Sequence, residues 1–125
     1  MDGSLPRCVL FADICDSSSL YRELGDSRAR DFVGKALSLA GQSVVENKGS
    51  IIDTIGDEVF CVLPNADDGL RAAIRIHEKV AAARCKNDLP IGLGFRIGIV
   101  FGPVHLKEEQ VFGDTVYWGF RISCG

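Results

Sequence analysis

The sequence of 125 residues predicts one α+β domain, with a ferredoxin-like antiparallel sheet and helices on one face. The length fits a single hydrophobic core. Hydrophobic residues make up 46% and charged residues 25%, which is typical of a globular protein. β-Prone runs and helical segments follow one another in the order β-α-α-β-β-α-β, with a β/α ending. No repeat or linker interrupts this order, so residues 1–125 are expected to form one domain.

The first elements are a strand and a short helix. Residues 7–14, "RCVLFADI", form a β-prone run that ends in an acid and predict the first strand. Asp16 or Ser17 is expected to cap the short helix that follows, and Gly25 to end it.

A longer helix is predicted to begin at Asp26 and to close through Gly49. Its apolar residues recur at helical spacing, which predicts one buried face. The face consists of Phe32, Ala36, Leu39, Ala40 and Val44.

Residues 50–55 and 59–64 read as two strands joined by Gly56-Asp57-Glu58 into a hairpin. Asn65 or Asp67 is expected to cap the next helix. The apolar stripe expected on that helix is Leu70, Ala73, Ile74, His77, Val80 and Ala81. Because His77 is alone on the stripe, a partly buried or edge histidine explains it better than a metal ligand.

The remaining chain contains one more clear strand. Residues 92–102, "GLGFRIGIVFG", alternate in hydrophobicity, and Gly102-Pro103 predicts a turn after them. Residues 111–125 are expected to begin as a strand or turn and to enter a helix near Thr115.

Composition excludes several classes of function. The net charge is −3 and the Lys and Arg residues are scattered, which argues against a nucleic-acid-binding face. No apolar run approaches the roughly 20 residues of a membrane helix, and no secretory signal is visible, so a cytoplasmic location is expected. The 5 cysteines match no zinc pattern and are expected to be buried thiols rather than disulfides.

The topology predicts a pair of carboxylates at one edge of the sheet. The first strand should run parallel to the second, with the third antiparallel between them, so the end of the first strand meets the hairpin turn. This places Asp13 beside Asp57, with Gly56 permitting a tight turn. Close carboxylates repel each other unless they are protonated or bridged by a cation. Mg²⁺ or Mn²⁺ suits such a pair together with phosphate oxygens.

Neighbouring residues are suited to phosphate. After Asp13, "ICDSSS" opens a helix whose free N–H groups and Ser hydroxyls could hold a phosphate. Arg96 alternates with Phe95 and Ile97, faces the other side of its strand, and could reach the same group. In the plainer alternative, Asp13 is only a helix cap and Gly-Asp only a hairpin turn. The dinucleotide fingerprint and the Walker A pattern are both absent.

Three blocks of the sequence resemble the class III adenylate/guanylate cyclases. They are "VLFADICDSSSLYRELGD", "KGSIIDTIGDEVFCVLPNADDGLRAAI" and the pair "GFRIGIVFGPVH" and "VFGDTVYWGFRI". The blocks occur in the family's order and cover nearly the whole chain. The resemblance implies the nucleotide cyclase fold. It also implies conversion of a purine nucleoside triphosphate, ATP or GTP, to the 3′,5′-cyclic monophosphate and pyrophosphate in signal transduction.

The resemblance also implies a site and a partner. Asp13, Asp57 and the backbone carbonyl of Ile14 would be ligands for two Mg²⁺ or Mn²⁺ ions. The backbone around Ser17 and Ser18, helped by Arg96, would hold the phosphates, and Arg121 would stabilise charge at the α-phosphate in the transition state. Such sites lie between two catalytic domains, so a homodimer, or a heterodimer with another cyclase domain, is expected.

The sequence departs from the family pattern in the residues that contact the nucleoside. Tyr117 stands where the family has the Asn that orients the ribose, and Gly119-Phe120 replaces a pair of small residues. The base-reading positions hold Asp53 and Gln110, where adenylate cyclases typically have Lys and Asp and guanylate cyclases Glu and Cys. A carboxylate at residue 53 accepts hydrogen bonds from guanine, which favours GTP.

The family domain continues beyond the arginine helix with further strands and a phosphate-binding lysine. The chain, which ends at Gly125, is expected to be short at its C-terminus and to lack these last strands. A sheet edge or apolar patch exposed in this way would favour association with another chain.

Three functional hypotheses remain open at this stage. The first is an active cyclase. The second is a catalytically impaired cyclase-homology module that binds metal or nucleotide, or pairs with a partner domain, as Tyr117 and Phe120 suggest. The third is a diguanylate cyclase. The hairpin of that family carries Gly-Gly-Asp/Glu-Glu-Phe, and residues 56–60, "GDEVF", resemble it only weakly.

Overall fold

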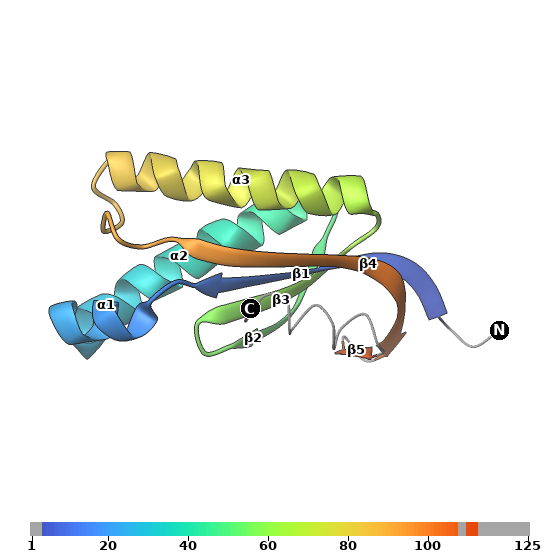
Figure 1. Cartoon of the computed structure of the whole chain (residues 1–125), viewed down its shortest axis with the longest axis horizontal. Helices are drawn as coiled ribbons and strands as arrows, with labels where there is room; N and C mark the ends of the chain where they lie inside the picture. Colours follow the sequence, from blue (N-terminus) through green and yellow to red (C-terminus); the bar gives the residue numbers. More distant parts are fainter. Residues whose placement is uncertain (1–3, 108–109, 113–125) are drawn as a thin grey trace.

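The computed structural model describes residues 4–107 and 110–112, and it has the predicted α+β fold (Figure 1). The strands are β1 (Ser4–Ile14), β2 (Ser50–Ile55), β3 (Glu58–Leu63), β4 (Phe95–Lys107) and β5 (Gln110–Phe112). The helices are α1 (Ser17–Leu24), α2 (Asp26–Glu46) and α3 (Ala66–Cys85). The predicted order of elements is therefore confirmed through residue 107, whereas the helix expected near Thr115 lies outside the described residues.

The strands form one sheet in the order β2-β3-β1-β4-β5, and all neighbouring strands are antiparallel. Because β3 lies between β1 and β2 and is antiparallel to both, β1 and β2 run in the same direction, as predicted. The two edge strands also approach each other, since β5 comes close to β2. The sheet is therefore strongly curled rather than flat.

The hydrophobic core lies between the sheet and the helices. Alternate residues of β1 point into it, namely Cys8, Leu10, Ala12 and Ile14, all of which are buried against residues of α2 and α3. The intervening residues Val9 and Phe11 lie on the opposite face in a smaller apolar cluster with Val62 of β3. Asp13 continues this second row, so its side chain faces away from the helices.

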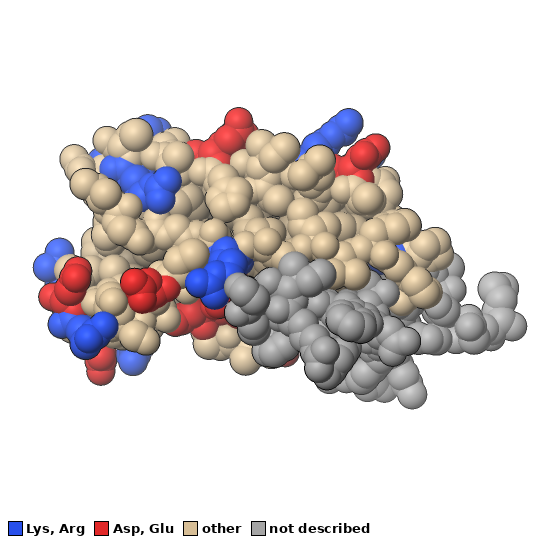
Figure 2. Space-filling view, in the orientation of Figure 1, with Lys and Arg blue, Asp and Glu red and all other residues tan. Residues whose placement is uncertain are grey.

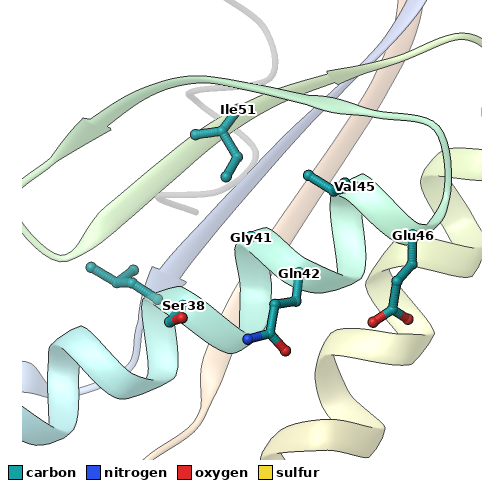
Figure 3. Close-up of a pocket in the computed structure, with 7 residues that line it drawn as sticks. Ser38, Gly41, Gln42, Val45, Glu46 and Ile51 are labelled. Carbon is teal, nitrogen blue, oxygen red and sulfur yellow. The ribbon is translucent and has the colours of Figure 1, made fainter.

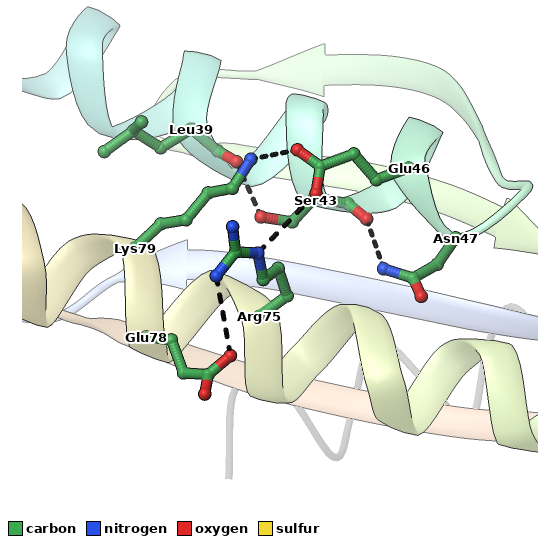
Figure 4. A network of polar contacts seen from close by, with 7 residues as sticks. All are labelled: Leu39, Ser43, Glu46, Asn47, Arg75, Glu78 and Lys79. Atoms are coloured by element: carbon green, nitrogen blue, oxygen red, sulfur yellow. Dashed lines mark hydrogen bonds and ion pairs between the residues drawn. The ribbon is translucent and has the colours of Figure 1, made fainter.

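The predicted apolar face of α2 is confirmed, because Ala36, Ala40 and Val44 are buried and Phe32 and Leu39 pack against the core. Polar contacts then fix α2 against α3 (Figure 4). The carboxylate of Glu46 on α2 accepts a hydrogen bond from the Nζ of Lys79 and lies 3.6 Å from the Nε of Arg75. The Lys79 hydrogen bond, followed by the charges of Lys79 and Arg75, lowers the pKa of Glu46.

The C-terminal end of α2 corrects one prediction. The residue with left-handed backbone is Lys48, with φ of 71°, rather than Gly49. The N–H of Gly49 donates to the carbonyl of Val44 at 2.9 Å, and that of Lys48 to Val45 at 3.1 Å, which is a Schellman end. Gly49 is needed for a different reason: a Cβ there would lie 2.6 Å from Val44 Cγ1 and 2.7 Å from Leu63 Cγ.

The stripe predicted for α3 is also partly wrong. Leu70 and Ile74 are 56% and 52% exposed, and His77 is exposed rather than partly buried. The helix instead buries Gly69, Ala72, Ala73, Ile76 and Val80, with Gly69 so close to β1 that a Cβ would lie 2.1 Å from the Sγ of Cys8. Ala73 and Val80 of the predicted stripe are therefore buried, whereas Leu70 and Ile74 lie outside the core. Asn65 is the cap, and its Oδ1 accepts from the N–H of Asp68 at 2.8 Å.

The turn predicted at Gly102-Pro103 does not occur. β4 continues through both residues, with Gly102 opposite Arg7 and Pro103 opposite Pro6 of β1. The first residues of β1 provide a partner strand there, and proline readily adopts extended backbone. Tertiary pairing therefore overrides the local turn signal.

The cysteines of the described residues are free thiols. Cys8 and Cys61 are buried as predicted, whereas Cys15 is half-buried and Cys85 is exposed, so the prediction of buried thiols is wrong for Cys85. Burial raises the pKa of the Cys8 thiol to about 11 and that of Cys61 to about 12, so both are expected to be unreactive at neutral pH. Cys124 lies outside the described residues. Within residues 4–107 and 110–112, none of the helices is long and apolar enough to cross a membrane.

Candidate functional site

The end of β1 meets the β2–β3 hairpin, as the topology predicts. Asp13 lies opposite Glu58 in the register of β1 and β3, and the backbone N–H of Ile14 donates to the carbonyl of Asp57 at 3.2 Å. Gly56 begins the turn with φ of 57°, a conformation that favours glycine. The structure therefore brings Asp13, Ile14 and Asp57 together, and their role as metal ligands stays a prediction.

The carboxylates of this edge are crowded. Burial raises the pKa of Asp13, the guanidinium of Arg96 lowers it, and the charge of Asp57 raises it. Burial also raises the pKa of Glu58, and the charge of Asp13 adds to this rise. Mutual repulsion of acids in partly buried positions is the condition that a bound cation would relieve.

Glu58 was predicted to belong to the hairpin turn, but it is the first residue of β3. Its side chain is half-buried on β3, directly opposite Asp13. The alternation of β3 could have indicated this, because Glu58 lies at even spacing from Phe60 and Val62, which share the face of Asp13.

The donor set fits a hard divalent ion that is shared with a nucleotide. Within the described residues, no group of three or more His, Cys, Asp and Glu side chains could hold a metal by itself. Mg²⁺ is typically bound by one or two carboxylates together with substrate phosphates. Asp13 and Asp57, whose like charges interact across the hairpin, match that kind of site rather than an all-protein cage.

The N-terminus of α1 lies three residues after Ile14. Asp16 occupies the cap position with φ of 57°, but its side chain caps no N–H group of the helix. The first N–H groups of a helix have no partner within it, so those of Ser17 and Ser18 remain suited to an anion. The N–H of Cys15 donates to the carbonyl of Gly94 at 2.9 Å, which fixes this loop beside the start of β4.

Arg96 is exposed and lies opposite Asp13 in the register of β1 and β4, while Phe95 is buried on the other face. Arg96 therefore faces the opposite side of its strand from Phe95, as predicted. Among the described residues, Arg96 and Asp13 form no ion pair within 4 Å, although the guanidinium acts on the pKa of Asp13.

The two predicted base-reading residues lie on strands that approach each other. Asp53 is exposed on β2, where its Oδ1 accepts from the N–H of Thr54 at 2.8 Å. Gln110 begins β5, the strand that comes close to β2. Tyr117 and Arg121, predicted to contact the ribose and the α-phosphate, lie outside the described residues, as do Gly119 and Phe120.

A cavity lies elsewhere in the structure and includes none of these residues. It has a volume of about 580 Å³ between α2 and β2, and Figure 3 shows Ser38, Gln42, Val45 and Ile51 around it. Its lining contains only one charged residue, Glu46, so it offers no chemistry comparable to the Asp13 edge. On the face seen in Figure 2, acidic and basic side chains gather together at the end that carries α1, without segregation by sign.

The chain is similar to known cyclases. No protein-family model matches it. An adenylate cyclase of Streptomyces griseus is 29% identical over 118 residues, which cover 94% of this chain and 28% of the relative. An adenylate cyclase 2 of Rhizobium meliloti is 29% identical over 131 residues, which cover 94% of this chain and 36% of the relative. The chain thus spans about a third or less of these curated relatives.

Solved structures show the same fold. A bacterial light-regulated adenylyl cyclase superimposes with a TM-score of 0.82 at 20% identity, covering 97% of this chain and 70% of that one. The guanylyl cyclase domain of a fusion protein from Blastocladiella emersonii also gives 0.82 at 20% identity, covering 97% and 75%. The predicted resemblance is therefore confirmed: the chain is similar to adenylate cyclases in sequence over more than nine-tenths of its length and has the fold of class III nucleotide cyclase catalytic domains.

Proposed function

We propose that residues 1–125 form a single catalytic domain of a class III purine nucleotide cyclase, which converts GTP or ATP to the 3′,5′-cyclic monophosphate and pyrophosphate in signal transduction. The observation that carries the proposal is the pairing of the β1 end with the β2–β3 hairpin. This pairing places Asp13, Ile14 and Asp57 together and Arg96 beside them. The similarity to adenylate cyclases over 94% of the chain supports it.

In this proposal each residue of the edge has a distinct task. Asp13, Asp57 and the carbonyl of Ile14 hold two Mg²⁺ or Mn²⁺ ions, which supply neutralisation of the triphosphate and a lowered pKa for the ribose 3′-hydroxyl. The N–H groups at Ser17 and Ser18 bind phosphate oxygens. Arg96, exposed beside Asp13, pairs with the same phosphates. Arg121 stabilises the charge that develops at the α-phosphate.

The proposed substrate preference is for GTP. Asp53 is an exposed carboxylate on β2, and one of its oxygens is already bonded to the Thr54 N–H. The other oxygen remains able to accept from the N1–H and N2–H donors of guanine, which adenine lacks. Gln110 can both donate and accept hydrogen bonds, so it discriminates less between guanine and adenine. Asp53→Lys is expected to shift the preference from GTP toward ATP.

The site is proposed to be completed by a second domain, either another copy of this chain or another cyclase domain. The sheet face that carries Asp13 also carries the stacked rings of Phe11 and Phe60, whose centroids are 4.7 Å apart. Phe11 is buried within the chain and Phe60 is half-buried, so the face without helices carries apolar residues beside the proposed catalytic edge. A cytoplasmic location is proposed, since the reaction consumes an intracellular nucleotide.

An impaired cyclase-homology module is the second candidate, because Tyr117 replaces the ribose-orienting Asn of the family. Turnover of GTP and ATP in Mn²⁺ separates the two candidates. An enzyme gives cyclic product in the wild type, and Tyr117→Asn increases its yield. A binding module gives metal-dependent nucleotide binding without product. Absence of both nucleotide binding and product contradicts both candidates.

A further inference from the structure

A second cavity lies on the sheet, at the end of β1 opposite to Asp13, and the charged side chains that line it are cationic. It has a volume of about 330 Å³, within the range of small-molecule sites. Arg7 and Lys48 line it, together with Ser50, and none of the lining residues that the structure describes is acidic. Arg7 precedes Asp13 by six residues on β1, which places the cavity about 20 Å from the proposed catalytic edge.

The two cations flank one strand. Arg7 belongs to β1, Lys48 lies two residues before the start of β2, and β3 runs between β1 and β2. Neighbouring strands are about 4.8 Å apart, so the two backbones lie about 10 Å apart, and long side chains from both sides can reach one anion. The end of β3 between them offers an apolar floor of Val62 and Pro64, continued by Ile52 on β2.

Both cations are available to a ligand. In the described part of the chain, neither Arg7 nor Lys48 forms an ion pair. One guanidinium nitrogen of Arg7 donates to the carbonyl of Pro6 at 2.9 Å, which anchors the side chain and leaves its other donors. The planar guanidinium matches a carboxylate or phosphate with two parallel hydrogen bonds.

The backbone of Lys48 is an independent sign that its side chain matters. The described non-glycine residues with positive φ are Asp16, Lys48 and Asn87. Asp and Asn adopt this conformation comparatively easily, whereas lysine does so at a cost. The Schellman end of α2 normally has glycine at this position, so Lys48 breaks a strong local preference at the residue that lines the cavity. Such exceptions concentrate where function requires them.

We propose that Arg7 and Lys48 form a binding site for a small organic anion, a carboxylate or phosphate monoester carried on an apolar body. The anionic group lies between the two cations, and the apolar body packs on Ile52 and Val62. The site does not depend on the cyclase proposal, because it shares no residue with the Asp13 edge.

The test measures binding of phenyl phosphate and benzoate to the whole chain by isothermal titration calorimetry at constant ionic strength, with inorganic phosphate as the probe without an apolar body. We expect at least one aromatic anion to bind at least tenfold more tightly than inorganic phosphate, and the comparison of the two distinguishes phosphate from carboxylate ligands. Arg7→Gln and Lys48→Gly should each weaken that binding at least tenfold. Lys86→Gln, which removes an exposed lysine at the end of α3, and Asp57→Ala should leave it within twofold.

Lys48→Gly also separates binding from folding. Because glycine suits the left-handed position, this variant should have a higher melting temperature than the wild type while losing the ligand. The proposal would be overturned if Arg7→Gln and Lys48→Gly changed the affinity less than tenfold. It would also be overturned if Asp57→Ala abolished binding. Equal affinity for inorganic phosphate and both aromatic anions would also overturn it.

Discussion

The backbone N–H of Ile14 donates to the carbonyl oxygen of Asp57 at 3.2 Å, and this bond ties the end of β1 to the β2–β3 hairpin. The carboxylates of Asp13 and Asp57 are then held on neighbouring backbones at one edge of the sheet. The arrangement costs repulsion between like charges, and it gives a hard divalent ion two oxygen ligands in fixed positions. Stability and proposed activity should therefore respond in opposite directions when one of these acids is neutralised.

Asp13→Asn is expected to stabilise the fold while removing activity. Burial and the charge of Asp57 act to raise the pKa of Asp13, so its ionised form is penalised in the folded state. The gain in free energy of unfolding should be on the order of 0.5 kcal/mol at pH 7 without divalent ions, as for partly solvated charges. It should diminish as the pH falls through the raised pKa, because the wild-type acid is then protonated too. Urea unfolding at pH 7 and pH 3 measures this, and a less stable variant at pH 7 would contradict it.

Glu46→Gln should show the opposite pH dependence. The Lys79 hydrogen bond lowers the pKa of Glu46 below its usual 4.5, so the stabilising contribution is present above that value and is lost as the pH falls through the lowered pKa. The variant should melt at a lower temperature than the wild type at pH 7 and at the same temperature near pH 2. Glu78→Gln is the matched control, since Glu78 lies 3.8 Å from Arg75 on its own helix and does not join α2 to α3. An equal decrease in melting temperature at pH 7 in both variants would argue against a stabilising contact between α2 and α3.

Gly49→Ala should destabilise the fold by about 1–3 kcal/mol, because the new Cβ would overlap Val44 and Leu63. Gly34→Ala is the matched control on α2, where a Cβ meets nothing within 4 Å. The free energy of unfolding of Gly34→Ala should increase by about 0.5–1 kcal/mol, because alanine has a better helix propensity than glycine. Thermal unfolding of both variants measures the contrast, and a Gly49→Ala variant as stable as Gly34→Ala would contradict the predicted overlap.

Much of the fold could be predicted from the sequence because its signals are local or periodic. The hairpin at Gly56-Asp57 and the apolar face of α2 follow from turn chemistry and helical spacing. The meeting of Asp13 and Asp57 follows from topology once the strand order is known. The buried face of α3 could be predicted only in part: Ala73 and Val80 are buried as expected, but hydrophobicity wrongly favours Leu70 and Ile74, and the close approach to β1 that requires Gly69 is not visible in the sequence.

Other features depend on distant pairing and were missed for that reason. The continuation of β4 through Gly102 depends on residues at the start of β1, far away in the sequence. The alternation of β3 places Glu58 on one face with Phe60, but the contact of that face with Asp13 depends on the pairing of β3 with β1. The left-handed Lys48 is not predictable from propensity, because the adjacent Gly49 is the stronger local signal.

Formation of cyclic nucleotide tests the central claim most directly. The wild type and Asp57→Asn are incubated separately with GTP and with ATP in the presence of Mn²⁺, and cyclic product and pyrophosphate are quantified together. Loss of a metal ligand should reduce product at least 100-fold, on the order of what one essential electrostatic contact supplies. We predict equimolar cyclic product and pyrophosphate from the wild type, more from GTP than from ATP, and almost none from Asp57→Asn. Equal product from the two proteins would contradict it.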